Sequence, residues 1–103
     1  MPSMTAQLRI YGLYPQTWQE FARKVNEEIV PLRLEHGFRL DGPWFVEENC
    51  QYVWVVHYEG EGTFEEAEER YDSDPRWADL SFDPMDYIAD VDIRTLIPQP
   101  RPS

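Results

Sequence analysis

The chain has 103 residues, of which 42% are hydrophobic and 15% aromatic, and its formal net charge is −11 at pH 7. This length and apolar content predict one folded domain and exclude a largely disordered chain. Residues 59–92 hold thirteen acidic and two basic residues, so the negative charge is concentrated in the second half. Such a surface repels nucleic acid and anionic membranes, and we expect neither as a partner.

The ends of the chain and its cysteine content set the expected location and domain bounds. No apolar run is long enough to span a membrane, and the N-terminus lacks a signal-peptide core, so we expect a cytoplasmic protein. The lone Cys50 excludes an internal disulfide framework. Residues 1–97 are predicted to form the single domain, and residues 98–103, with three prolines, an extended tail.

The first half of the domain is predicted to begin with a strand and a helix. The strand is Ala6–Tyr14, and Pro15 ends it. Thr17 and Glu20 have the spacing of a capping box, which predicts the start of a helix. Apolar residues then recur at helical spacing, so one stripe of this helix is expected to be buried. Pro31 lies inside the pattern and should kink or divide the helix.

Two strands come next, Phe38–Glu47 and Gln51–Tyr58, and the short connection between them predicts a hairpin. The first of them is expected to be interrupted near Gly42-Pro43.

The acidic half of the chain predicts two short helices and a final strand. Thr63 and Glu66 repeat the capping-box spacing and start the first helix. Asp74 followed by Pro75 predicts the start of the second. The last strand lies within Tyr87–Ile97, where apolar and polar residues alternate.

The predicted order is β-α-β-β-α-β, which indicates an α+β, ferredoxin-like fold: a four-stranded antiparallel sheet with both helices on one face. The strand Gln51–Tyr58, QYVWVVHY, is largely apolar on both of its faces, so we expect both to be covered. The helices cover only one face. We therefore predict a homodimer in which two sheets meet face to face, with space for a small molecule between them.

Alternation along the strands places Arg9, Tyr11, Trp54 and Tyr58 on one face, which we expect to be turned into the space between the two sheets. A guanidinium beside aromatic rings and phenols suits a planar or anionic ligand. Arg9 is the candidate for stabilising negative charge, and Tyr11 or Tyr58 the candidate proton donor or acceptor. In the alternative interpretation, Arg9 pairs with an acid across the dimer and the rings fill a closed core.

Four segments of the chain, in this order, resemble the NIPSNAP family, its bacterial members especially. They are LRIYGLYP (Leu8–Pro15), EEIVPLRLEHGFRLDGPW (Glu27–Trp44), YVWVVHYEG (Tyr52–Gly60) and DPRW (Asp74–Trp77). The resemblance implies the dimeric α+β barrel and its homodimer. The chain differs from bacterial relatives at Val56, where they often carry an arginine, and at His57, where a small residue is usual.

The candidate ligand contacts are Trp44, Trp54 and His57. Trp44 and Phe45 lie on opposite strand faces, and we assign Trp44 to the pocket because it matches a tryptophan of the family. His57 is a candidate general base by its ordinary pKa. Its position, however, places it with Val53 and Val55 on the face expected to pack on the helices, where it would be a hydrogen-bonded structural residue.

The predicted function is therefore small-molecule binding by a homodimer. If the protein is an enzyme, the resemblance implies a monooxygenase, isomerase or cyclase that needs no cofactor. We expect no metal site, because the two histidines are far apart in sequence and no cysteine accompanies them at ligand spacing. The alternative function is a protein-interaction module without catalysis, which would use the acidic helix containing Glu65, Glu66, Glu68 and Glu69.

Overall fold

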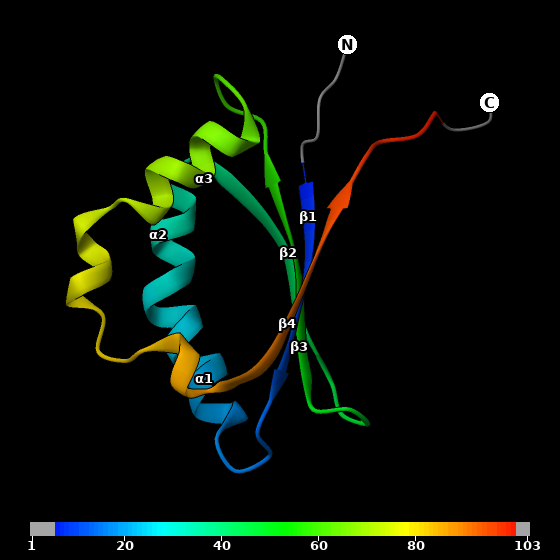
Figure 1. Ribbon diagram of the computed structural model, residues 1–103, viewed down its shortest axis with the longest axis vertical. Coiled ribbons are helices and arrows are strands. Elements are labelled where there is room, and N and C mark those ends of the chain that lie inside the picture. The colour runs from blue at the N-terminus through cyan, green and yellow to red at the C-terminus, as the bar shows by residue number, and fades with distance from the viewer. Residues whose placement is uncertain (1–5, 101–103) are drawn as a thin grey trace.

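The computed structural model describes residues 6–100 of the chain (Figure 1). Residues 1–5 of the predicted domain and residues 101–103 of the predicted tail lie outside this range. Residues 97–100 form neither helix nor strand. The elements follow the predicted β-α-β-β-α-β order.

Four strands form one antiparallel sheet in the order β2-β3-β1-β4. They are β1 (Ala6–Leu13), β2 (Phe38–Val46), β3 (Gln51–Tyr58) and β4 (Ile88–Leu96). All the helical segments lie on one side of this sheet, and no helix or strand of residues 6–100 covers the other side (Figure 1). The predicted ferredoxin-like α+β fold is confirmed.

The first helix is divided near Pro31, as predicted. Helix α1 (Trp18–Lys24) passes into a π-helical segment (Val25–Ile29), and α2 (Val30–Glu35) follows. A proline inside a helix lacks the N–H donor and crowds the carbonyl of the preceding turn, and the wider π-helical turn before it relieves this conflict. Gly37, with φ of 89°, then ends the helix in the left-handed conformation that glycine adopts readily.

One of the two predicted capping boxes forms. The Thr63 hydroxyl accepts from the Glu66 amide at 3.1 Å, and the Glu66 carboxylate accepts from the Thr63 amide at 2.8 Å. At Thr17 the predicted helix start is confirmed, since α1 begins at the next residue, but the predicted capping box is wrong, because the Thr17 side chain makes no capping hydrogen bond. The Glu20 carboxylate instead accepts from the Tyr87 hydroxyl at 2.7 Å, so it is used to hold another part of the chain.

Helix α3 (Phe64–Asp72) is joined to β4 by residues 73–87, here called the connecting segment. This segment contains two 3₁₀ turns, Pro75–Asp79 and Pro84–Asp86, and runs past α2 and α1 (Figure 1). Asp74 caps the first turn by accepting from the Arg76 amide at 2.8 Å. The predicted helix start at Asp74 and Pro75 is thus confirmed as a short 3₁₀ turn.

The structure corrects our prediction of which sheet face is turned into the barrel. Arg9, Tyr11, Trp54 and Tyr58 do share one face of the sheet, as alternation predicts, but this face is the one that the helices cover. Tyr11, Trp54 and Tyr58 are buried within the chain itself, with exposed fractions of 8, 2 and 7%. Aromatic side chains bury the largest areas, and the bulky buried stripe of α1 and α2, which includes Phe21, provides the matching cover.

The opposite face, here called the open face, has no cover within residues 6–100. Leu8 and Ile10 of β1 pair across the sheet with Val55 and Val53 of β3, and all four side chains remain partly exposed. Val53 and Val55 are the two that we expected to pack on the helices. The four residues form an aliphatic surface on the two central strands.

Strand β2 is interrupted at Gly42-Pro43, as predicted. Its pairing register with β3 shifts between Asp41 and Trp44, which is a β-bulge with one extra residue. Because of this extra residue, Asp41 and Trp44 both lie on the open face, whereas Phe45 faces the helices.

Candidate functional site

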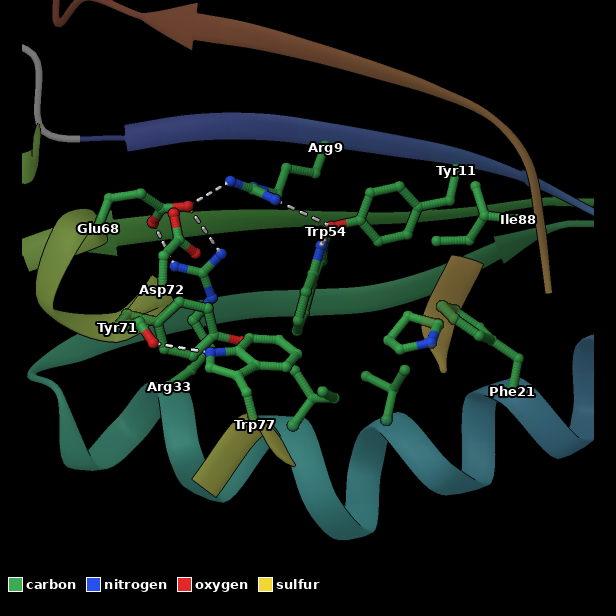
Figure 2. A pocket seen from close by; sticks show the side chains of 13 residues that line it. Arg9, Tyr11, Phe21, Arg33, Trp54, Glu68, Tyr71, Asp72, Trp77 and Ile88 are labelled. Atoms are coloured by element: carbon green, nitrogen blue, oxygen red, sulfur yellow. Dashed lines mark hydrogen bonds and ion pairs between the residues drawn. The ribbon is translucent and has the colours of Figure 1, made fainter. Parts of the chain in front are cut away.

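A cavity of about 130 Å³, here called the inner cavity, lies between the sheet and the helices. Its two ends differ in chemistry (Figure 2). Four charged side chains gather at one end, and aliphatic or aromatic side chains, including Phe21 and Ile88, gather at the other. The charged residues are Arg9, Arg33, Glu68 and Asp72. The rings of Trp54 and Trp77 form walls between the ends.

A second depression of about 420 Å³, here called the outer groove, adjoins the inner cavity. The two share lining residues from β1, the connecting segment and β4, namely Arg9, Tyr11, Trp77, Pro84 and Ile88. Ligand sites in proteins usually have volumes of roughly 300–1,000 Å³. The inner cavity alone is smaller than that, but the inner cavity and the outer groove together fall within this range.

Arg9 projects from the central strand β1 and is held by three neighbours. Its guanidinium donates to Gln7 Oε1 at 2.9 Å, to the Tyr11 hydroxyl at 3.2 Å and to Glu68 Oε2 at 2.7 Å. Burial by itself lowers the pKa of Arg9, but Tyr11 and Glu68 raise that pKa overall. The guanidinium is therefore a fixed positive charge at one end of the inner cavity.

The Tyr11 hydroxyl oxygen receives two hydrogen bonds. One comes from Arg9 Nη1 at 3.2 Å and the other from the Trp54 indole at 3.3 Å. No side chain or carbonyl within residues 6–100 accepts the hydrogen of this hydroxyl. A phenol in this arrangement can donate its proton to a ligand, and its two donors would stabilise negative charge left on the oxygen.

Arg33 of α2 and Glu68 of α3 form an ion pair across the charged end of the cavity, with Nη1 to Oε1 at 2.6 Å. The Arg33 side chain is only 3% exposed, and its guanidinium lies over the rings of Tyr71 at 3.9 Å and Phe38 at 4.7 Å. Its Nε is buried without a hydrogen-bond partner among the described residues. The charge is thus stabilised by Glu68 and by the ring faces.

Tyr71, Asp72 and Trp77 complete this end of the cavity. Burial raises the pKa of Tyr71, so its phenol stays protonated. Burial also raises the pKa of Asp72, with a further contribution from the negative charge of Glu68. The Trp77 indole donates to the Tyr71 carbonyl at 2.7 Å, and this bond fixes the connecting segment to the end of α3.

The structure brings together three of the six predicted site residues. Arg9, Tyr11 and Trp54 are joined by hydrogen bonds and line the inner cavity. Tyr58 lies on the same face but does not line it. Its hydroxyl donates a hydrogen bond to the Glu61 carbonyl at 2.6 Å and accepts one from Arg70 at 3.1 Å. The hydroxyl therefore acts as donor and as acceptor within the chain.

Trp44 and His57 lie on the open face, away from the inner cavity. Trp44 is 56% exposed on β2. His57 lies beside Val53 and Val55, as predicted, and it is hydrogen-bonded, with Nε2 at 2.6 Å from Asp41 Oδ2. The expectation that helices would cover His57 is wrong, since this face is open within the described chain.

Sequence reasoning missed five residues of the site, Arg33, Glu68, Tyr71, Asp72 and Trp77. A signal for two of them was present. Arg33 follows the buried Ile29 by four positions, and Glu68 follows the buried Phe64 by four. Each is a charged residue on the buried stripe of its helix, and the two charges are opposite, which indicates a pair between the helices.

Residues 6–100 contain no group of three or more histidine, cysteine, aspartate or glutamate side chains placed to hold a metal ion. Over the same residues, no helix has the length and apolar character needed to cross a membrane.

A model of the NIPSNAP family matches residues 6–101 of the chain. Solved structures have the same fold. An uncharacterized NIPSNAP domain protein from Burkholderia xenovorans is 20% identical, with a TM-score of 0.80 over 93% of this chain and 95% of that chain. A NIPSNAP family protein from Agrobacterium tumefaciens is 21% identical, with a TM-score of 0.79 over 94% of each chain.

The fold also resembles that of a putative antibiotic biosynthesis monooxygenase from Bacteroides thetaiotaomicron. That protein is 20% identical, with a TM-score of 0.68 over 91% of this chain and 88% of that chain. At such identities the likeness shows a common fold. No curated protein matches the chain.

Proposed function

The chain belongs to the NIPSNAP family, and we propose that it binds a small, partly aromatic or acidic metabolite in the inner cavity. One observation carries this proposal. Inside a space lined by rings, the Arg9 guanidinium and the Trp54 indole both donate to the Tyr11 oxygen, whose own hydrogen is unused among the described residues. A few convergent polar groups in a largely apolar pocket are typical of sites that orient a small ligand.

If the ligand is converted, Arg9 and Tyr11 support proton transfer without a cofactor. Tyr11 would give its proton to the ligand or take one from it, and Arg9 would stabilise the negative charge that develops beside it. One structural neighbour is named a putative antibiotic biosynthesis monooxygenase. We accordingly propose isomerisation, cyclisation or monooxygenation of a molecule that is itself reactive once deprotonated. In a monooxygenation, dioxygen would be the co-substrate and the deprotonated molecule would supply the electrons, so that one oxygen atom enters the product and the other leaves as water.

We further propose that the protein is a homodimer, located in the cytoplasm, whose two sheets meet through their open faces. The support is the aliphatic surface formed by Leu8, Ile10, Val53 and Val55, which residues 6–100 leave uncovered. Exposed contiguous apolar surface of this kind marks an interface, and a twofold dimer covers it with its own copy. Trp44 and His57 then belong to the interface, and the ligand site lies within each subunit.

A second candidate function is the interaction module that uses the acidic surface of α3. A depression of about 320 Å³ on this helix is lined in part by Glu65, Glu69 and Asp72. Its lining would suit a basic peptide or protein, and no catalysis would be required. Saturable binding of a lysine-rich peptide, with no binding of small aromatic probes, would favour this candidate over the first.

The test of the proposed function is thermal unfolding with a panel of one-ring probes, including phenol, benzyl alcohol and benzoate. Binding to the folded state raises the unfolding midpoint. We expect at least one probe to raise it in the natural protein and the effect to be lost in Arg9→Ala. Arg23→Ala is the matched control, because Arg23 is exposed on α1, away from both the cavity and the open face, and pairs with Glu27.

Light scattering on the same samples checks that Arg9→Ala leaves the oligomeric state unchanged. Equal midpoint shifts in the natural protein and in Arg9→Ala would refute the assignment of the inner cavity.

A further inference from the structure

Two guanidiniums converge on one carboxylate at the charged end of the inner cavity. Arg9 comes from the sheet and Arg33 from α2, and both contact Glu68 of α3 (Figure 2). Glu68 Oε2 lies 2.7 Å from Arg9 Nη2 and 3.3 Å from Arg33 Nη2, while Oε1 lies 2.6 Å from Arg33 Nη1. A carboxylate held between two arginines is the arrangement in which proteins bind a carboxylate ligand.

The carboxylate that fills this arrangement lies at the boundary of the cavity. Glu68 lines the inner cavity on one side and the depression of about 320 Å³ on the surface of α3 on the other. Its side chain is 20% exposed, whereas the side chains of Arg9 and Arg33 are 13% and 3% exposed. Glu68 is thus the most exposed of the three charged side chains, and it borders the surface depression, so it needs the smallest rearrangement to turn toward solvent.

Arg33 requires a partner if Glu68 turns away. Its charge is buried, and a buried charge without a counter-charge is strongly unfavourable. Its Nε already lacks a hydrogen-bond partner among the described residues, whereas buried polar atoms in proteins are nearly always paired. A ligand carboxylate that enters the cavity would supply the charge that Glu68 removes.

The inner cavity as a whole has a volume close to that needed for one aromatic ring. Its volume is about 130 Å³, and an apolar protein cavity of roughly 150 Å³ is known to hold benzene. Trp54 and Trp77 line the space next to the charged end, and Phe21 closes the opposite end.

We propose that the ligand is a one-ring aromatic carboxylate, and that Glu68 is an internal competitor which occupies the carboxylate position until the ligand displaces it. This inference depends on the proposed function, because it names the ligand class of the same cavity. The ring packs among the indoles, the carboxylate pairs with Arg33 and Arg9, and the Glu68 side chain moves to the surface of α3.

Calorimetric titration of three proteins with benzoate and with benzyl alcohol tests this. The proteins are the natural chain, Glu68→Gln and Glu69→Gln. The last is the control, because Glu69 is an exposed neighbour on the same helix and its substitution removes the same charge. Loss of the competitor should tighten benzoate binding by about tenfold or more in Glu68→Gln. Benzyl alcohol has no carboxylate, so its affinity should change little, and Glu69→Gln should resemble the natural chain.

The outcomes separate this inference from the proposed function. If benzyl alcohol binds, but the affinity for benzoate is no higher in Glu68→Gln than in the natural chain, the ligand class is wrong and the cavity assignment stands. If neither probe binds any of the three proteins, the proposed function fails and this inference fails with it.

A measurement on the natural chain covers the case in which Glu68→Gln does not fold. The side-chain carboxyl ¹³C resonance of Glu68 should shift on saturation with benzoate and stay in place with benzyl alcohol. A Glu68 resonance that does not shift when benzoate is bound would overturn the proposal that the ligand displaces Glu68.

Discussion

The guanidinium of Arg33 lies 2.6 Å from the carboxylate of Glu68, although the two residues are 35 positions apart in the chain. The pair joins α2 to α3 above the sheet, at the point where the inner cavity is most polar. It is therefore both a structural contact between two helices and part of the candidate site, and the two roles can be separated by experiment.

The structural role predicts that Arg33→Ala lowers the free energy of unfolding by about 3 kcal/mol, since it breaks a buried pair and removes the contacts with two rings. Urea unfolding measures this. The control is Arg23→Ala, which breaks an exposed pair with Glu27 on the helix surface and should cost about 0.5 kcal/mol or less. Equal effects of the two substitutions would show that the Arg33 pair adds nothing beyond a surface contact.

Tyr11→Phe should leave two donors without their acceptor, the buried Trp54 indole and the partly buried Arg9 Nη1. We expect a loss of about 1–3 kcal/mol in unfolding free energy, together with a shift of the Trp54 indole resonance. Tyr14→Phe is the matched control, because Tyr14 is 45% exposed and makes no side-chain hydrogen bond within residues 6–100. An unmoved Trp54 signal in Tyr11→Phe would contradict the hydrogen bond on which the site depends.

The proposed dimer predicts that Val53→Asp dissociates the protein into monomers. The substitution introduces a charge into the aliphatic surface of the open face, and the twofold axis would bring two such charges close together. Light scattering over a range of concentrations reports the mass. Leu34→Asp makes the same change at an apolar side chain that is 53% exposed on α2, and it should leave the dimer intact. A natural chain that is monomeric at micromolar concentration rules out the dimer itself.

Acid should weaken the cap that positions Trp77. Hydrogen bonds from Arg76, and a further one from His36, hold the pKa of Asp74 well below its usual range. Because the folded pKa lies below the ordinary value of about 3.9, the charged cap contributes its full stability above that value and loses it as the pH falls through the folded pKa.

Asp74→Asn isolates this effect, since asparagine also caps helical turns. The stability difference between the natural chain and Asp74→Asn should therefore narrow as the pH falls below about 4. Urea unfolding at a series of acidic pH values measures this difference. A difference that stays constant down to about pH 2 would show that the Asp74 carboxylate contributes no charge-dependent stability.

The fold was predictable because the sequence patterns of its elements are local. The apolar run of Gln51–Tyr58, the capping box at Thr63 and the proline at position 75 each reflect interactions within a few residues. The same locality explains the error at Thr17. Thr17 and Glu20 have the right spacing for a capping box, but the Glu20 carboxylate accepts a hydrogen bond from Tyr87, which is 67 positions away.

The choice of covered face was not predictable from one strand. Alternation separates Tyr52 and Trp54 from Val53 and Val55, but it does not say which set meets the helices. That depends on the volume of the helix stripe, because large rings need large partners to close the space around them. The sequence places the charged residues Arg33 and Glu68 on the buried stripes of their helices. Whether the two form an ion pair depends on how the helices lie side by side.

Indole N–H resonances test the central claim, that the ligand site lies between sheet and helices, most directly. The chain has four tryptophans, and single Trp→Phe substitutions assign their signals. Titration with benzoate or benzyl alcohol should shift the signals of Trp54 and Trp77, which line the inner cavity, and leave that of Trp44 on the open face unchanged. A shift of Trp44 alone would place the ligand between the two sheets and contradict the account.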